Sequence, residues 1–386
     1  MKLCIVTHSL IKGDGQGRVN YEVACEAIRR GHHVTVLASK IAPELERHSF
    51  VNWVPISAKV PTELMRNMMF AFKSTNWLRK HRHQIDLIKA NGAITWAKSD
   101  ANAVHFVHNS WLKFSNLNSS LEATSVNKKT ILHPYLALYN SYQWLYTKLN
   151  THWEKQAFEN AKVVVAVSDK VAEDLREIGV PQNEIKVISN GVDVEEFSPG
   201  NVGSRQTWNL PNGVPLAMFA GDIRLPRKNL DTVLKALVEV PDLHLAVVGV
   251  TDGSPYPQLA KSLGISDRVH FLGFRRDIPS LMKIVDFFVF PSRYEPFGLV
   301  IIEAMATGLP VITASCTGAA PIITPEAGIV LSDPNDNKAL AEAMQKLTVN
   351  PDLRITMGRT AREIALQHTW KNMAQQYLDL FEEMKK

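Results

Sequence analysis

The sequence predicts an α/β protein with two doubly wound domains. Its 386 residues exceed the length that one ordinary hydrophobic core supports. The pattern of residues 2–38 predicts a strand, a helix and a second strand, which is the usual start of a parallel sheet. The same order returns in residues 287–313, where two short apolar runs flank a helical stretch. Two such units in one chain predict two parallel sheets, each covered by helices.

The composition is typical of a soluble globular protein, with 45% hydrophobic and 21% charged residues. The three cysteines, Cys4, Cys25 and Cys316, are far apart, which favours a reducing compartment and indicates no metal site. The first residues contain too short an apolar run for a signal peptide. No stretch approaches the roughly 18 apolar residues that a membrane span needs. We therefore expect a cytoplasmic protein.

The net charge of +5 is unevenly distributed. Residues 1–190 hold 24 Lys and Arg against 16 Asp and Glu, so the positive charge belongs to the first half. A basic half suits an anionic lipid, an anionic acceptor or nucleic acid, and it equally suits an ordinary solvated surface. The charge alone does not select among these.

A glycine-rich segment, residues 12–18, joins a predicted strand over 2–7 to a predicted helix over 18–30. Backbone N–H groups around Gly15 and Gly17 can hold a diphosphate there, helped by the helix dipole. An NAD-binding fingerprint is the rival interpretation. It fails because the spacing is GxGxG after a long loop and because the second strand, 34–38, ends without the acidic residue that holds a ribose.

Residues 55–83 combine apolar and basic side chains. A helix on a membrane surface has this composition, and so has a helix packed on the core with snorkelling Lys and Arg. Residues 133–153 are rich in Tyr and Trp and suit either a core or an acceptor groove.

Residues 85–89 and 103–107 predict two further strands, and His108 follows the second of them. That position lies at the sheet edge where open α/β sheets bind ligands. His105 is three residues earlier, and one of the two histidines can be an ordinary core residue.

A strand over 216–221 predicts the start of the second sheet, and a basic loop follows it. Arg224, Arg227 and Lys228 lie within five positions at the carboxyl end of this strand. Three cations there predict an anionic ligand, because each charge-assisted bond to a phosphate contributes roughly 1.5–3 kcal/mol. The alternative is a solvated basic loop.

Two glutamates follow the apolar run at 287–290. Glu295 falls in the loop after this predicted strand, and Glu303 falls about one turn into the predicted helix over 300–307. Each could be ordinary, Glu295 as a loop cap and Glu303 as a solvated side chain. Their place at the carboxyl edge of a sheet favours a ligand site instead.

The amino-acid sequence of this segment is more specific for a protein family than either glutamate by itself. The Glu-x7-Glu spacing, Glu-Pro-Phe-Gly-Leu and the Gly-Leu-Pro-Val stop together resemble the signature of the retaining GT-B glycosyltransferases of family 4. Val-Ile-Ser-Asn-Gly-Val-Asp at 187–193 resembles the interdomain junction of that family, with a tight Asn-Gly turn of positive φ. The implied fold is GT-B, with two doubly wound, Rossmann-like domains facing a central cleft.

The resemblance implies domain boundaries and residue roles. The first domain is 1–197, on the acceptor side, with a helix at 370–386 packing back on it, and the nucleotide-sugar domain is 198–369. The implied catalytic residues are His108, Lys228 and Glu295. The implied donor-binding residues are Gly15, Gly17, Arg224, Arg227, Lys228, Phe274, Arg275, Glu295, Phe297, Gly298, Leu299 and Glu303.

Within that set, Glu295 is implied to bind the donor sugar, Glu303 the ribose, and Lys228 with an arginine the diphosphate. Three positions depart from the family pattern. Asp222 stands where an arginine is expected, Asn109 stands where an aspartate often follows the histidine, and the loop 315–321 lacks a second glycine and a glutamate. The first departure leaves open whether Arg224 or Arg227 reaches the diphosphate.

The resemblance implies a retaining hexosyltransferase that uses a UDP- or GDP-linked sugar and a glycan, lipid or small-molecule acceptor. It implies no cofactor, no metal and no nucleic acid, and it allows a peripheral membrane contact through the first domain. The alternatives are a nucleotide-sugar epimerase of the same architecture, a non-catalytic GT-B binding protein and, as the most remote, a glycoside hydrolase using Glu295 and Glu303. The hydrolase hypothesis gives no role to the basic loop.

Overall fold

The computed structural model describes residues 1–386 apart from 14, 58–59, 111, 113–133 and 201–202. The chain divides into two compact units, Met1–Ser189 with Met373–Lys386, and Asn190–Asn372. The first unit ends before the boundary at 197 that the sequence predicts. None of the described helices is long and apolar enough to cross a membrane.

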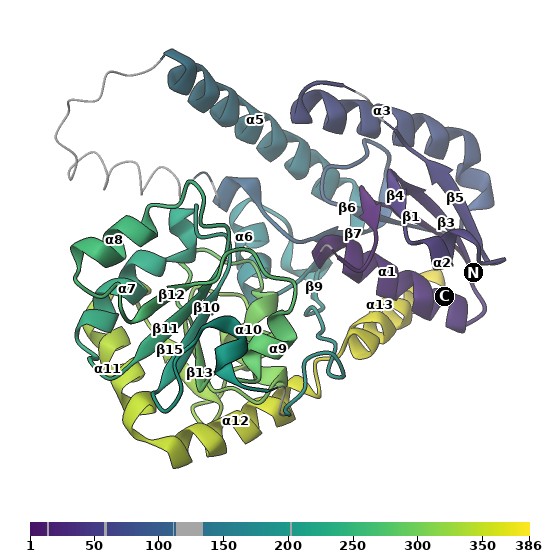
Figure 1. The fold of residues 1–386 in the computed structure, drawn as a ribbon. Coiled ribbons are helices and arrows are strands. Elements are labelled where there is room, and N and C mark those ends of the chain that lie inside the picture. Colours follow the sequence, from purple (N-terminus) through teal and green to yellow (C-terminus); the bar gives the residue numbers. More distant parts are fainter. Residues whose placement is uncertain (14, 58–59, 111, 113–133, 201–202) are drawn as a thin grey trace. The chain divides into compact units, whose positions relative to one another are not determined.

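The first unit is built on a parallel sheet of seven strands (Figure 1). Their order is β5-β3-β1-β6-β7-β8-β9, so the direction of winding reverses between β1 and β6. The strands are β1 Lys2–Val6, β3 His33–Ala38, β5 Val51–Pro55, β6 Leu87–Asn91, β7 Ser99–Val104, β8 Ala161–Ala166 and β9 Ile185–Val187. A separate short pair consists of β2 Ser9–Leu10 and β4 Lys40–Ile41.

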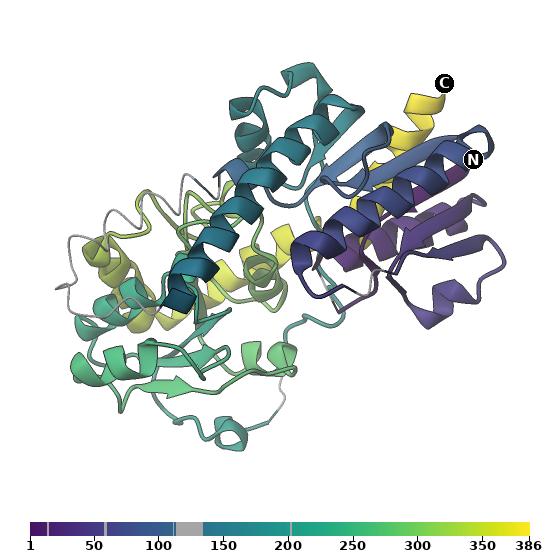
Figure 2. The ribbon, with the colours of Figure 1, turned by 90° about the horizontal axis from the view of Figure 1, so that it is seen from above.

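Helices cover both faces of this sheet. They are α1 Gly15–Arg29, α2 Pro43–Glu46, α3 Glu63–His81, α5 Pro134–Glu159, α6 Asp169–Glu177 and α13 Trp370–Lys385. Because strand side chains alternate between faces, Ile88 of β6 packs with Phe70 of α3, and Lys89 points to the opposite face, where Tyr377 of α13 lies. Helices α3 and α5 meet at Asn67, whose amide donates to the Tyr146 hydroxyl at 3.2 Å, and their course can be followed in Figure 2.

Two local predictions in this unit are wrong. Helix α1 begins at Gly15, so Gly15 and Gly17 lie in its first turn and not in a preceding loop. Strand β7 ends at Val104, so both His105 and His108 lie beyond it, and His108 begins a helical turn. The apolar Phe106 and Val107 extended the predicted strand, although the chain has already turned away from the sheet there.

The second unit contains a parallel sheet of six strands in the order β12-β11-β10-β13-β14-β15. The strands are β10 Leu216–Ala220, β11 His244–Val248, β12 Val269–Phe271, β13 Phe287–Phe290, β14 Val311–Ala314 and β15 Gly328–Leu331. The covering helices are α7 Leu230–Val238, α8 Tyr256–Ser262, α9 Ile278–Met282, α10 Leu299–Ala306, α11 Asn337–Val349 and α12 Pro351–Ala365. The order of the strands reverses between β10 and β13.

Gly191 carries the chain into this second unit. A Cβ on Gly191 would lie 2.2 Å from the backbone nitrogen of Trp370, so no other residue fits there without a backbone shift. Val192 also donates to the carbonyl of His368 at 2.9 Å. The positive φ that the Asn-Gly dipeptide predicts is absent at Gly191, because a close approach of two chain segments and not a turn requires this glycine.

Candidate functional site

The loops after β10 and β13 meet at the point where the strand order of the second sheet reverses, which is where open α/β sheets bind ligands. Asn229, in the left-handed conformation, holds the two loops together. Its buried amide donates to the carbonyls of Pro291 at 2.8 Å and Pro334 at 2.6 Å, and its oxygen accepts from the Thr232 hydroxyl at 2.6 Å. Sequence reasoning missed Asn229. The available signal was an asparagine directly before a helix.

Lys228 and Glu295 form an ion pair across these loops. Lys228 is only 12% exposed and lies 5.1 Å from the centre of the Phe290 ring. Burial lowers the pKa of Lys228, while the Glu295 carboxylate opposes this shift. A second cation, Arg227, lies 3.7 Å from the same Glu295 oxygen. The two cations that the sequence places in a loop therefore converge on one carboxylate.

Arg224 takes a different direction. Its guanidinium donates to both oxygens of Asp222 at 2.8 Å each, and 48% of its side chain is exposed. Asp222 therefore neutralises Arg224 and leaves Arg227 beside Lys228. The residue that departs from the expected pattern also separates the roles of the two arginines.

Gly298 shapes the turn between Glu295 and helix α10. Its φ is +98°, and a Cβ would lie 2.9 Å from the Ile301 side chain and 3.3 Å from the Glu295 side chain. Gly318 donates to the carbonyl of Glu295 at 2.8 Å, and Ala319 donates to that of Phe297 at 2.7 Å. These bonds fix the backbone of the turn that leads to Leu299, the first residue of α10.

Glu303 lies on α10, where among the described residues no lysine or arginine pairs with it. Burial raises the pKa of the Glu303 carboxyl to about 7, and Glu196 adds to the rise. A buried carboxyl without a cation is costly to ionise.

We predict that the pKa of Glu303 makes stability depend on pH. Between about pH 4.5 and 7 the folded chain retains a proton that the unfolded chain has lost, so stability falls as pH rises through this interval. Glu303→Gln removes this contribution. Its stability relative to the unaltered protein should therefore increase between pH 4.5 and 7.5, by on the order of 1–3 kcal/mol. Melting temperatures across this range measure the effect, and parallel pH profiles would contradict it.

The loop after β12 contains the two residues predicted to meet a base. Phe274 is 69% exposed. Arg275 donates to both oxygens of Asp277, at 2.8 and 2.6 Å, and this pairing holds the pKa of Asp277 near 2. Gly249 donates to the carbonyl of Gly273 at 3.0 Å, which brings this loop beside the one after β11. Arg275 is thus paired internally, whereas Phe274 and Arg276 are the exposed residues of this loop.

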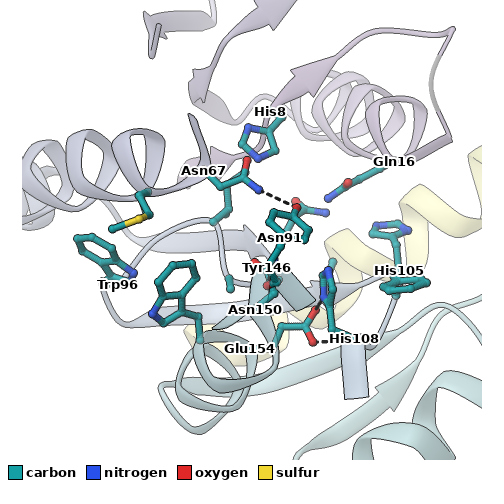
Figure 3. Close-up of a pocket in the computed structure, with 18 residues that line it drawn as sticks. His8, Gln16, Asn67, Asn91, Trp96, His105, His108, Tyr146, Asn150 and Glu154 are labelled. Carbon is teal, nitrogen blue, oxygen red and sulfur yellow. Dashed lines mark hydrogen bonds and ion pairs between the residues drawn. The ribbon is translucent and has the colours of Figure 1, made fainter. Parts of the chain in front are cut away.

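The first unit contains a cavity of about 160 Å³ at the reversal between β1 and β6 (Figure 3). His105 and His108 both line it. The Nδ1 atom of His108 lies 2.6 Å from one oxygen of Glu154, and the His108 backbone N–H donates to the other at 2.9 Å. The sequence pointed to Asn109 as the neighbour of His108, whereas its partner is Glu154, which lies 46 residues away on α5.

His105 differs from His108 in its partners. Its Nε2 atom is buried without a hydrogen bond, and burial together with the nearby Lys89 lowers the pKa of His105 to about 3. Its imidazole is therefore neutral at pH 7. Gln16, between the two predicted donor-binding glycines, lines the same cavity from the first turn of α1.

Two family models match this chain. Residues 13–196 match Glycosyltransferase Family 4, and residues 204–364 match Glycosyl transferases group 1. A D-inositol 3-phosphate glycosyltransferase of Corynebacterium urealyticum is 30% identical over 59% of this chain and 58% of its own length. The same enzyme of Corynebacterium jeikeium is 34% identical over 60% and 59%. The matched region thus spans about three fifths of these curated relatives.

Solved structures share the fold over the whole length of the chain. WaaG, a glycosyltransferase involved in lipopolysaccharide biosynthesis, aligns with a TM-score of 0.73 at 20% identity and covers 98% of this chain and 99% of its own. Sucrose-phosphate synthase from Thermosynechococcus elongatus gives 0.76 at 22% identity over 99% and 98%. Anabaena Alr3699/HepE in complex with UDP and glucose gives 0.68 at 21% identity over 99% of each chain. Both sheets accordingly have the predicted GT-B architecture.

Proposed function

Because the chain belongs to glycosyltransferase family 4, we propose that it transfers a hexosyl group from a UDP- or GDP-linked sugar to a hydroxyl group, with retention of the anomeric configuration. The acceptor is a glycan, a lipid or a small molecule. The observation that carries this proposal is the convergence of Lys228 and Arg227 on Glu295 at the reversal of the second sheet.

Each of these side chains has a task in the proposed reaction. Lys228 and Arg227 stabilise the diphosphate as its bond to the anomeric carbon breaks, a form of preorganised electrostatic catalysis. Glu295 accepts hydrogen bonds from the donor sugar, and Glu303 from the ribose. The acceptor hydroxyl attacks the face that the diphosphate leaves, and its proton passes to the departing diphosphate. The pairing of Arg224 with Asp222 supports Arg227 as the arginine that replaces the one expected at position 222.

The curated relatives are named for D-inositol 3-phosphate, so a phosphorylated polyol is one acceptor to consider, and UDP with glucose in a similar fold makes UDP-glucose one donor to consider. A non-catalytic GT-B protein remains the alternative, motivated by Asp222. A nucleotide-sugar epimerase is the other alternative, and it would convert one nucleotide-sugar into its epimer without any acceptor and without net release of the nucleotide.

Melting temperatures with a panel of nucleotides and nucleotide-sugars test the proposal. A ligand at 100 times its Kd should stabilise the protein by about 2.7 kcal/mol. The ligand that raises the melting temperature most is then used as the donor in assays of hydrolysis and of transfer. Binding without hydrolysis or transfer would favour the non-catalytic alternative, and a panel without any stabilising member would refute donor binding.

We also propose a peripheral membrane contact through α3. Met65, Met69 and Phe72 are exposed on this helix, together with the basic Arg66 and Lys73. An exposed apolar stripe beside basic side chains suits an anionic bilayer surface. Co-sedimentation should be stronger with anionic than with neutral vesicles, and equal or absent binding to both would refute the contact.

A further inference from the structure

We propose that the cavity of the first unit binds the acceptor and selects an uncharged, polyhydroxylated ring over its phosphorylated counterpart. This inference rests on the function proposed above and names the substrate class. The cavity lies where β1 and β6 end, at the reversal of the first sheet. His108 and its partner Glu154 form part of its wall, so a bound hydroxyl lies beside a histidine.

The wall presents several neutral polar groups. The amides of Asn67, Asn91 and Asn150 and the phenol of Tyr146 all line the cavity, as Figure 3 shows. Amides and hydroxyls both donate and accept, which matches the hydroxyl groups of a sugar or polyol. The faces of Trp96 and Trp153 add flat apolar surface for the C–H side of such a ring.

Two of the polar atoms in this wall are buried and have no partner in the protein: the Asn91 Nδ2 atom and the His105 Nε2 atom. Asn91 is only 4% exposed. The buried Lys89 donates to the Asn91 oxygen at 3.1 Å, so this bond occupies one end of the amide and leaves its NH₂ group free. A buried polar group without a hydrogen bond destabilises the protein, and a ligand hydroxyl would supply the missing partner.

The charges of the wall oppose a phosphate. Among the described residues that line the cavity there is no lysine or arginine, the side chains that recognise phosphate in most proteins. Glu154 is the acidic residue there, and its carboxyl group lies 2.6 Å from the Nδ1 atom of His108. Lys89 lies behind Asn91, where Asn20 and Asn91 accept its hydrogen bonds. A dianionic phosphate would thus lose its hydration without gaining a cation.

Matched acceptor pairs test this inference. Glucose and glucose 6-phosphate, methyl glucoside and its 6-phosphate, and myo-inositol and its 3-phosphate are assayed with the best donor. We expect kcat/KM to be at least about tenfold higher for the neutral member of each pair that reacts. A phosphorylated member that reacts equally well or better would overturn the inference, and so would a panel in which no neutral member reacts.

A variant tests whether this cavity is responsible. Asn67→Lys introduces a cation into the wall and should reduce the preference for the neutral member about tenfold. Asn52→Lys introduces the same charge on the exposed face of the edge strand β5 and should leave the preference unchanged. Melting temperatures confirm that both variants fold. An unchanged preference in Asn67→Lys would place acceptor selection elsewhere.

Donor hydrolysis, measured in the same samples without acceptor, separates the two proposals. If hydrolysis persists and phosphorylated acceptors are preferred, only the acceptor inference fails. If the donor neither binds nor reacts, the proposed function itself fails.

Discussion

Replacement of Lys228 by alanine is expected to lower the rate of hexosyl transfer by about 100-fold or more. The Lys228 ammonium is nearly buried and is positioned by Glu295, so its charge acts in a site with little water. Its loss removes the cation proposed to stabilise the leaving diphosphate as negative charge develops. The measurement is kcat for transfer and for donor hydrolysis, both of which should fall together.

Arg224→Ala is the matched control. It removes a cation from the same loop, but one that Asp222 neutralises and that is half exposed. We expect it to retain most of the activity. Because Lys228→Ala leaves Glu295 with only Arg227 nearby, melting temperatures must accompany the rates. Near-normal turnover in a folded Lys228→Ala variant would remove Lys228 from the site.

Replacement of His108 by alanine should lower the rate of transfer to the acceptor by about 100-fold or more. It should leave the affinity for the nucleotide-sugar unchanged. This split is expected because His108 lies in the first unit, whereas the proposed donor contacts of Lys228 and Glu295 lie in the second. Calorimetric titration with the donor and an assay of transfer measure the two quantities separately.

Glu154→Gln tests how His108 is held. The substitution keeps the shape of the side chain but removes the carboxylate that contacts both the ring and the backbone of His108. We expect a loss of transfer smaller than that of His108→Ala and a shifted pH profile. Full transfer by His108→Ala would show that this histidine is not part of the acceptor site.

The features that were predictable from the sequence depend on short-range patterns. Strand β13 is an uninterrupted apolar run with every residue buried, and helix α10 is the next helix along the chain. The loops that carry Lys228 and Glu295 were located for the same reason, since a parallel strand must end in a loop at the carboxyl edge of its sheet. Errors arose where apolar residues continued past an element, as beyond β7.

The pairings at the candidate sites were not predictable, because residues distant in sequence form them. Glu154 reaches His108 from another helix, and Asn229 bonds to Pro334 across 105 positions. The exclusive bond between Arg224 and Asp222 spans only two residues, yet the sequence left both arginines open because either could reach a phosphate. Side-chain direction, which the backbone geometry of the loop sets, decided between them.

By itself the sequence determined the fold class, the order of the two sheets along the chain, the loops that carry Lys228 and Glu295 and the helix that carries Glu303, because these depend on local hydrophobic patterns and on a specific motif. Only the tertiary structure decided which groups meet. It paired Lys228 with Glu295, separated Arg224 from Arg227, gave His108 its carboxylate and left the Asn91 amide free in a cavity. The physical reason is that a side chain's charge and hydrogen bonds depend on neighbours that packing of the strands and helices brings from distant parts of the chain.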